Sequence, residues 1–463
     1  MSALLSENDL NDFISPGLAC IKPTETVKED QGPSNELEVG KESNEVEKVS
    51  ISLQDCLACS GCITSSEEIL LGQQSYTVFL EAWRKLPEDA VLAVSIAPQS
   101  RLSLAKYYDV KLDVFDKGFV NFMHKYFAAK YVVGTQIGRN ITIKQTNEEL
   151  VRRKQQETFA KPTLCAVCPG FVLYAEKSKP ELVPFLLDVK SPQQITGSLL
   201  KQTNKNIYHL TVMPCFDKKL EASRKDGENE VDCVITPREF VTMLGELHVD
   251  MKDYADVPHS QSLMNACSPE NWDPQVHWAS NEGSSSGGFA FQYILHQQKK
   301  HPDSEVRTLE GKNSDITEYR LVDNSTGETI ASSSQVYGFR NIQNMVRKLS
   351  NSGTKTRNVK VLRKRNTNSS SRESTSGLAV DPVKTDFVEV MACPGGCING
   401  GGLLNGEQNS SRRRALAKTL ENEYRDTLPS VYNEGDVSYD VPYKYTFTPI
   451  EKSSDVVTVG NTW

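Results

Sequence analysis

The sequence lacks the features that mark several large classes of protein. Its 463 residues contain no stretch approaching the roughly 18 apolar residues of a membrane-spanning helix, and no internal repeat is apparent. The 52 basic and 60 acidic residues leave a formal charge of −8. This balance argues against a protein that mainly coats nucleic acid or anionic lipid, because those partners need a basic surface. The seven histidines form no metal-ligand spacing such as HExxH.

The first residues also lack targeting signals. Residues 1–17 carry acids where a secretory signal has a basic region and a long apolar core, and they are not Arg-rich as a transit peptide is. We therefore expect a cytosolic or nuclear protein, in which thiols stay reduced. Eleven cysteines, an odd number, then indicate metal or redox chemistry rather than a disulfide framework.

Two polar segments dilute an otherwise globular composition. Hydrophobic residues make up 38% of the chain, and the 28 glycines bring the apolar share to about 44%, slightly below the usual ~45–50%. Residues 25–48 hold eight acids and three bases, which predicts a solvated, flexible linker. Residues 351–380 hold seven bases and one acid, which favours a solvated insertion loop over a phosphosite or localisation signal.

Between these segments, strand and helix signals alternate. Apolar runs at 91–97, 206–213, 231–235 and 386–391 predict buried parallel strands. Thr236, Pro237 and Glu239 combine a capping box with proline at the first helical position. This order predicts a doubly wound α/β architecture, in which ligands bind beyond the carboxyl ends of strands. Cys215 and Cys393 both stand at such ends.

The first cysteine group is Cys56-x-x-Cys59-x-x-Cys62. Two-residue spacers let one loop offer three thiolates to one cuboidal cluster, as in bacterial ferredoxins. The usual continuation to a fourth cysteine and proline is missing, and Cys20 is the only other cysteine in the first 160 residues. The alternatives are a zinc knuckle or three incidental thiols. We favour an iron-sulfur cluster, because zinc prefers paired CxxC units.

The second group is spread along the chain. It comprises Cys165-Ala-Val-Cys168-Pro-Gly, Met213-Pro-Cys215 and Cys393-Pro-Gly-Gly-Cys397 followed by Ile-Asn-Gly-Gly-Gly. Glycine lets backbone approach a cluster closely and point N–H groups at its sulfurs. The alternative is a phosphate-binding glycine loop, but no P-loop Lys-Ser/Thr or dinucleotide fingerprint accompanies it. A metal site is therefore the better interpretation.

These segments resemble a known family. TLCAVCPGF (163–171), KSPQQITGSLLK (190–201), MPCFDKKLEA (213–222) and FVEVMACPGGCINGGG (387–402) look like the signature segments of iron-only hydrogenases. EGSSSGGFAFQYIL (282–295) resembles a further segment more weakly. The resemblance runs from about residue 91 to the end, except for the polar insertion. It implies that one [4Fe-4S] cluster is held by Cys168, Cys215, Cys393 and Cys397.

Departures from the hydrogenase pattern indicate which branch of the family this is. Hydrogenases have two adjacent cysteines before Pro-Gly, and the first shuttles protons; here Val167 stands in its place. The glutamine that usually follows the triple glycine is Leu403. With the lone Cys20 before the triplet, these features make the chain similar to the hydrogenase-like assembly factors of the cytosolic iron-sulfur machinery, the Nar or narf-like proteins.

That resemblance implies an organisation and a function. We expect residues 1–80 to form an iron-sulfur module, residues 81–410 an α/β core of two lobes of doubly wound parallel sheet around a buried cluster, and residues 411–463 a helical tail. Two [4Fe-4S] clusters are implied, the N-terminal one on Cys20, Cys56, Cys59 and Cys62. The implied role is cluster transfer from a scaffold complex to apoproteins in the cytosol and nucleus, without hydrogenase activity.

The same resemblance bears on single residues. Trp463 resembles the C-terminal aromatic residue that docks proteins of this pathway on the targeting complex, although Gly460-Asn461-Thr462 departs from the usual residues before it. Lys218 matches a hydrogenase lysine and here would neutralise cluster charge. Cys165, Cys233 and Cys267 are expected to be spare, packed thiols. A working hydrogenase and a nuclear protein with a structural zinc remain the alternatives.

Overall fold

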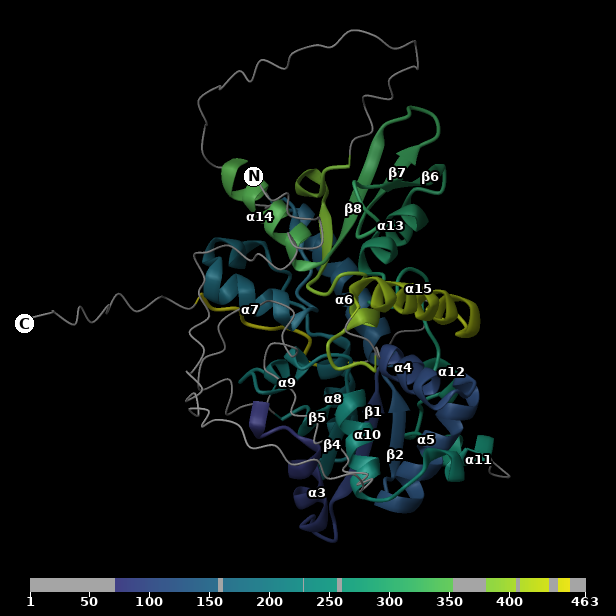
Figure 1. Cartoon of the computed structure of the whole chain (residues 1–463). Coiled ribbons are helices and arrows are strands. Elements are labelled where there is room, and N and C mark those ends of the chain that lie inside the picture. The colour runs from purple at the N-terminus through teal and green to yellow at the C-terminus, as the bar shows by residue number, and fades with distance from the viewer. Residues whose placement is uncertain are drawn as a thin grey trace, which may run out of the picture.

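The computed structural model describes residues 71–156, 161–227, 229–255, 260–352, 380–404, 409–432 and 440–449. Two sheets with their covering helices form two lobes, one above the other in Figure 1. The N-terminal cysteines, the 25–48 linker, Trp463 and nearly all of the 351–380 insertion lie outside the described residues. Within the described residues, no helix is both long and apolar enough to cross a membrane.

The first lobe is built on a four-stranded sheet, here called sheet A, in the order β2-β1-β4-β5 with every pair parallel. Its strands are β1 (Val91–Ile96), β2 (Tyr131–Gly134), β4 (Ile207–Val212) and β5 (Cys233–Ile235). Around it lie α3 (Tyr76–Arg84), α4 (Pro98–Tyr108), α5 (Leu112–Phe127), α8 (Pro192–Thr203), α9 (Asp217–Ala222), α10 (Pro237–Glu246), η3 (Met251–Tyr254), α11 (Ser260–Ala266) and α12 (Pro274–His277).

Alternating side chains of β1 explain why sheet A is covered on both faces. Leu92 and Val94 pack into a core with Phe119 of α5 and Phe240 of α10. Ala93 points the other way, into a second core formed largely by α6 (Gln136–Lys154) and α8. A parallel strand that is buried on both faces has a continuous apolar run, the pattern from which the sequence predicted this strand. The predicted doubly wound arrangement is thus confirmed for this lobe.

The second lobe is built on a five-stranded sheet, sheet B, in the order β3-β9-β8-β7-β6. Its strands are β3 (Thr163–Leu164), β6 (Ser304–Glu310), β7 (Ile316–Asp323), β8 (Thr329–Tyr337) and β9 (Phe387–Met391). The remaining elements are α6 (Gln136–Lys154), α7 (Pro169–Ser178), η2 (Pro180–Phe185), α13 (Phe289–Lys300), α14 (Phe339–Ser352), η4 (Pro382–Lys384), η5 (Cys397–Asn399) and α15 (Ser410–Thr427). In Figure 1, α15 lies across the level between the two sheets.

Sheet B departs from the expected parallel arrangement in its outer strands. β3, β9 and β8 are parallel, but β8, β7 and β6 form an antiparallel meander. The connections between β6 and β7 and between β7 and β8 are short, and a short connection returns the chain beside the strand it has just left. The β7–β8 turn includes Gly327 at φ 72°, a left-handed conformation that suits glycine.

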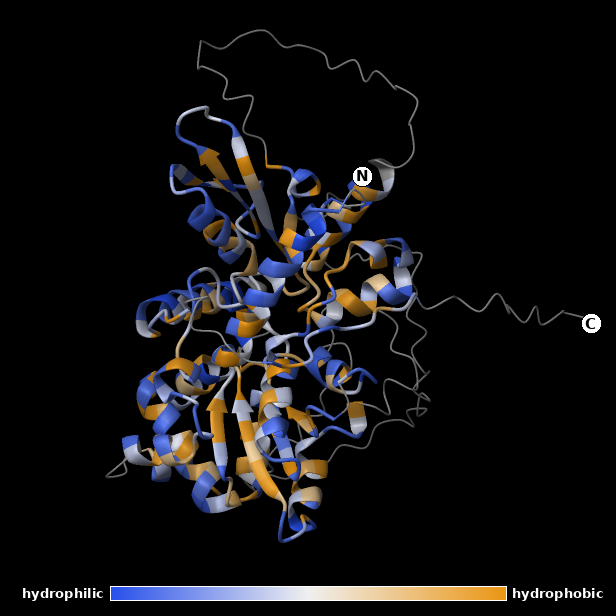
Figure 2. Ribbon diagram, turned by 180° about the vertical axis from the view of Figure 1, so that it is seen from behind, coloured by the Kyte–Doolittle hydropathy of each residue, from blue (hydrophilic) through white to orange (hydrophobic). Residues whose placement is uncertain are grey.

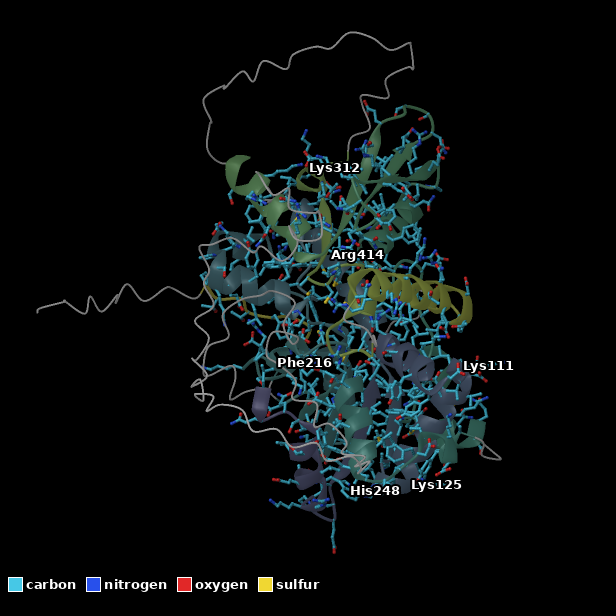
Figure 3. All side chains as sticks on the ribbon, in the orientation of Figure 1. Lys111, Lys125, Phe216, His248, Lys312 and Arg414 are labelled. Atoms are coloured by element: carbon cyan, nitrogen blue, oxygen red, sulfur yellow. The ribbon has the colours of Figure 1, made fainter. Side chains whose placement is uncertain are left out.

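Hydropathy follows this arrangement. In Figure 2 the strands of sheet A are largely orange, whereas the outer strands of sheet B mix orange with blue and white. Basic side chains such as Lys111, Lys125 and Lys312 are exposed and lie at the periphery of the molecule (Figure 3). Each lobe therefore has its own apolar interior.

Candidate metal centre

Four cysteines follow the carboxyl ends of three parallel strands. Cys168 comes after β3 and is the N-cap of α7, and Cys215 follows β4 in the turn before α9. Cys393 lies just beyond β9, and Cys397 begins η5. Sheet B thus supplies three thiols and sheet A one. The sequence placed Cys215 and Cys393 at strand ends, and the structure shows the same for Cys168.

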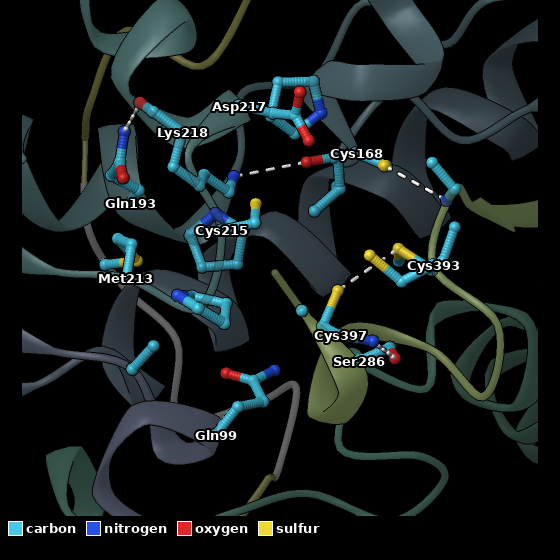
Figure 4. A pocket seen from close by; sticks show the side chains of 18 of the residues that line it. Gln99, Cys168, Gln193, Met213, Cys215, Asp217, Lys218, Ser286, Cys393 and Cys397 are labelled. Atoms are coloured by element: carbon cyan, nitrogen blue, oxygen red, sulfur yellow. Dashed lines mark hydrogen bonds between the residues drawn. The ribbon is translucent and has the colours of Figure 1, made fainter. Parts of the chain in front are cut away.

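These four thiols line a single cavity between the lobes. The other walls of this cavity include Met213, Pro214, Met391 and Ala392. In the close-up view, the sulfur atoms of Cys168, Cys393 and Cys397 lie on one side and Cys215 faces them from the other (Figure 4). The structure therefore brings together the four residues that the resemblance implied as one ligand set.

Two glycines allow the cysteine-bearing loops of the two lobes to approach each other. A Cβ on Gly400 would lie 2.3 Å from the Pro214 carbonyl oxygen, closer than any real contact. Two residues on, the Gly402 N–H donates to that same carbonyl at 2.9 Å. The glycine run after Cys397 is therefore needed for contact with the Met213-Pro214-Cys215 turn.

Gly396, between Cys393 and Cys397, has a different reason to be glycine. Its φ of 87° is rarely adopted by other residues, and an added Cβ would lie 2.3 Å from Ser286 Oγ. That hydroxyl accepts a hydrogen bond from the Cys397 N–H at 2.9 Å. The loop is held further by Asp315, whose Oδ1 accepts from the Gly395 N–H at 3.0 Å. These contacts fix where the Cys397 thiol points.

Burial is the main influence on the pKa of each of the four thiols, and it raises that pKa. The cysteines have some accessible surface because they face a hollow, but the surrounding protein excludes most solvent and raises the pKa of each thiol. Burial raises the pKa of Cys397 to about 12. For Cys168, a hydrogen bond from the Ala392 N–H, 3.4 Å from Sγ, acts in the opposite direction. A cationic metal bound in this cavity would favour the thiolate forms of these cysteines.

Lys218 stands at the cavity wall but is already paired. Its Nζ lies 2.8 Å from Glu221 Oε2 and donates to the Val167 carbonyl at 3.2 Å. Gln193 donates to the backbone carbonyl of Lys218 at 3.2 Å (Figure 4). The positive charge expected beside the cluster is therefore present, but Glu221 largely balances it.

The cysteines outside the ligand set lie elsewhere. Cys165, 1% exposed, packs in an apolar cluster of the second lobe, and Cys233 and Cys267 are buried in the core of the first. None of the three is among the residues that line the cavity. Cys20, Cys56, Cys59 and Cys62 are outside the described residues, so their grouping stays a prediction.

Three further residues at this site were not among those predicted from the sequence. Gln99 of α4 and Arg139 of α6 line the cavity together with Ser286. Arg139 lies in a helix with polar residues along its whole length, so nothing in the local pattern distinguishes a buried arginine there from an exposed one. Ser286 belongs to the weakly matching 282–295 segment, and that match was its only signal.

The donor set fits an iron-sulfur cluster. In the described ranges, no three Cys, His, Asp or Glu side chains converge on one point as the ligands of a single ion do. Each thiolate of a [4Fe-4S] cluster binds a different iron, so its four ligands surround a volume instead. Four soft thiol ligands around a largely apolar hollow match that requirement.

Two comparisons of the sequence with known proteins, one with a family and one with single relatives, agree with each other. Residues 90–401 match the family described as iron only hydrogenase large subunit, C-terminal domain. The chain is 58% identical to the cytosolic Fe-S cluster assembly factor NAR1 of Kluyveromyces lactis and 51% identical to that of Saccharomyces cerevisiae, in each case over all of both chains.

The fold has counterparts among solved structures. An apo variant of the [FeFe]-hydrogenase HydA1 from Chlamydomonas reinhardtii superposes with a TM-score of 0.55 at 19% identity, covering 76% of this chain and 90% of the hydrogenase. At that identity the likeness concerns the fold. The identity to full-length relatives is far higher, and the chain belongs to the family of cytosolic Fe-S cluster assembly factors named NAR1, built on the iron-only hydrogenase fold.

Proposed function

We propose that this protein is a component of the cytosolic iron-sulfur assembly machinery that binds two [4Fe-4S] clusters and passes clusters from a scaffold complex to apoproteins in the cytosol and nucleus. The observation that carries the proposal is the convergence of Cys168, Cys215, Cys393 and Cys397 on one cavity between the lobes. The names of its full-length relatives support the pathway.

The inner cluster is the one these four thiols would hold. A bound cluster supplies electron storage at this position. The chain's own residues keep water away, through walls such as Met213 and Met391, and aim the ligands through Ser286 and the Gly396 turn. A cluster enclosed in this way is suited to retention rather than exchange.

The outer cluster is assigned to Cys20, Cys56, Cys59 and Cys62 on the ferredoxin-like spacing of the triplet. The acidic 25–48 segment between Cys20 and the triplet suggests a module that a recipient can reach. We therefore assign exchange to the outer cluster. Under anaerobic conditions an iron chelator should remove about half of the iron quickly and the rest slowly. A single release rate for all the iron would contradict this division.

Hydrogenase activity is not part of the proposal. Val167, 7% exposed, lines the cavity next to Cys168, at the position that in hydrogenases carries the proton-shuttling cysteine. An aliphatic side chain can neither take up nor release a proton, so this route is closed. The chain would therefore hold a cluster without turning over hydrogen.

Two kinds of partner follow from the proposed role. A scaffold complex would supply clusters, and a targeting complex with a β-propeller subunit would receive the protein, with Trp463 as the docking residue. Aromatic side chains often dominate small interfaces, which supports a terminal tryptophan in this role. Deletion of Trp463 should weaken binding to the purified targeting complex and leave the iron content unchanged.

One experiment tests the cluster assignment. Iron, zinc and acid-labile sulfide are counted on anaerobic protein, with EPR after reduction, for wild type and for Cys215→Ala. We expect about eight irons and eight sulfides in wild type and about half in the variant. Colourless protein with zinc and no sulfide would instead indicate a structural zinc protein. Hydrogen turnover, or infrared bands of carbonyl and cyanide, would indicate a working hydrogenase.

A further inference from the structure

The molecule contains an unusual buried arginine. Five lysine and arginine side chains are buried among the described residues, and in four the charge is matched by a carboxylate within ion-pair distance. Those four pairs are Arg101–Asp116, Lys190–Glu230, Lys218–Glu221 and Lys219–Glu239. The fifth, Arg139, is 3% exposed and has no carboxylate partner in the described parts of the chain. A buried charge without a counter-charge in ion-pair contact destabilises the folded chain.

The hydrogen-bond partners of the Arg139 guanidinium are uncharged groups. Its Nη1 donates to the Tyr424 hydroxyl of α15 at 2.8 Å, and its Nη2 donates to the Ser285 carbonyl at 3.1 Å. Its Nε has no hydrogen-bond acceptor among the described residues, and the residue lines the cavity that the four cysteines share. The guanidinium is therefore fixed in orientation but not neutralised.

The remaining charges at the cavity do not supply the missing anion. Lys218 is balanced by Glu221, and Asp217 adds a negative charge beside Cys168 and Cys215. A [4Fe-4S] cluster with four thiolates has a formal charge of roughly −2, which becomes more negative on reduction. Two carboxylates lie near the guanidinium, but neither forms an ion pair with it among the described residues: Glu421 accepts from Ser285, and Arg139 acts electrostatically on buried Glu389. A cluster bound by the four cysteines would bring its negative charge to the cavity wall that Arg139 lines.

We propose that Arg139 is the counter-ion of the inner cluster and raises its reduction potential. The inference rests on the proposed inner cluster. Adding an electron to a cluster costs less free energy when a fixed positive charge lies nearby in a medium that water cannot screen. Tyr424 is a positioning residue in this arrangement, because its hydroxyl sets the direction of the guanidinium.

The test is an anaerobic redox titration of the full-length holoprotein, followed by EPR. Arg139→Gln removes the charge, and Arg139→Lys keeps it. Arg152→Gln is the matched control: Arg152 is on the same helix, half-exposed, and roughly 20 Å away by helical rise. We expect Arg139→Gln to lower the reduced-to-oxidised ratio of one cluster at least tenfold at fixed potential, about 59 mV for one electron. Arg139→Lys and Arg152→Gln should stay within threefold of wild type.

The titration and the cluster content of the two Arg139 variants distinguish the remaining possibilities. Unchanged titration of both clusters in Arg139→Gln overturns it while leaving the cluster assignment intact. Wild-type protein with no inner cluster overturns the proposed function and this inference with it. Should Arg139→Gln lose the inner cluster, retention in Arg139→Lys supports the charge role. Loss from both variants overturns it in favour of a hydrogen-bonding role.

Discussion

At the scale of single residues, Cys165 and Cys168 offer a controlled comparison. They are three positions apart, but Cys168 lines the cavity and Cys165 is packed against apolar side chains. We expect Cys168→Ala to lose about four irons and Cys165→Ala to keep the wild-type content, because only the first removes a ligand. Iron and sulfide counts on the two purified variants measure this. Equal losses would show that Cys165 is also a ligand.

His277 provides a pH-dependent test at the same scale. Its Nδ1 accepts from the Gly134 N–H at 3.2 Å, so Nε2 carries the proton and donates to Ser268 Oγ at 2.9 Å. A second proton on Nδ1 would face that N–H. Burial, together with the positive charge of Arg101, lowers the pKa of His277 from 6.5 to about 3.

The sign of the effect on stability follows from this depressed pKa. Between about pH 6.5 and 3 the unfolded chain binds a proton at His277 that the folded chain does not, so stability falls as the pH falls, by at most about 1.4 kcal/mol per unit for this group. Denaturant unfolding of the metal-free, reduced protein at pH 7 and 5 should show a smaller decrease in His277→Gln than in wild type. The same variant of exposed His301 is the control. Equal decreases in all three would contradict the prediction.

Some residues of the site could be predicted from the sequence and others could not. The four cavity cysteines were accessible through motif resemblance because thiol ligands recur at recognisable spacings. Arg139 was not, because the role proposed for it depends on Tyr424, 285 positions away, and on the lack of a carboxylate within ion-pair distance among the described residues. Which acidic group faces a base is set by tertiary packing rather than by local pattern.

At the scale of elements, the structure confirms the capping box predicted at the start of α10. Thr236 accepts from the Glu239 N–H at 3.4 Å, and Glu239 accepts from the Thr236 N–H at 2.9 Å, which completes the predicted capping box. Thr236→Ala should lower the free energy of unfolding by about 1 kcal/mol.

Thr242 on the same helix is the matched control for this change. It is exposed and its hydroxyl bonds only to the Arg238 carbonyl one turn back, so Thr242→Ala should change stability by no more than about 0.5 kcal/mol. Urea unfolding at neutral pH compares the two variants. Equal stability of Thr236→Ala and Thr242→Ala would show that the box contributes nothing.

Strands were predictable from the sequence where their residues form an uninterrupted apolar run. The runs at 91–97, 206–213, 231–235 and 386–391 match β1, β4, β5 and β9 to within two residues at each end. The β6–β8 meander escaped prediction because β6 and β7 are partly exposed and rich in charged side chains. β8 is largely buried, but three consecutive serines interrupt its apolar pattern. β3 is only two residues long, too short for any periodicity to register.

At the scale of the whole molecule, the ligand set spans the lobes. Cys215 follows a strand of sheet A, whereas Cys168, Cys393 and Cys397 follow strands of sheet B. A cluster bound by all four would tie the lobes together and stabilise the folded chain, because the unfolded chain offers no assembled site. Cluster removal should lower the thermal midpoint and increase proteolysis at segments joining the lobes.

Cys215→Ala is the informative variant for this prediction. It removes the cavity thiol that the first lobe contributes, and its stability should match that of chelated wild type whether or not iron is supplied. Calorimetry and limited proteolysis under anaerobic conditions make the comparison. A variant as stable as loaded wild type would show that the cluster does not join the lobes.

The order of the chain through the two sheets has a consequence for biosynthesis. The chain leaves sheet A after β2, places β3 in sheet B, returns to sheet A for β4 and β5, and completes sheet B last, with β9. The partner of β3 is therefore translated more than two hundred residues after it. At ribosomal rates of 5–20 residues per second, Cys168 waits roughly 10–50 s for Cys397 to be made. The four cysteines cannot come together on the ribosome until nearly all of the printed sequence has emerged, so the proposed inner cluster would have to be installed after both lobes have been made.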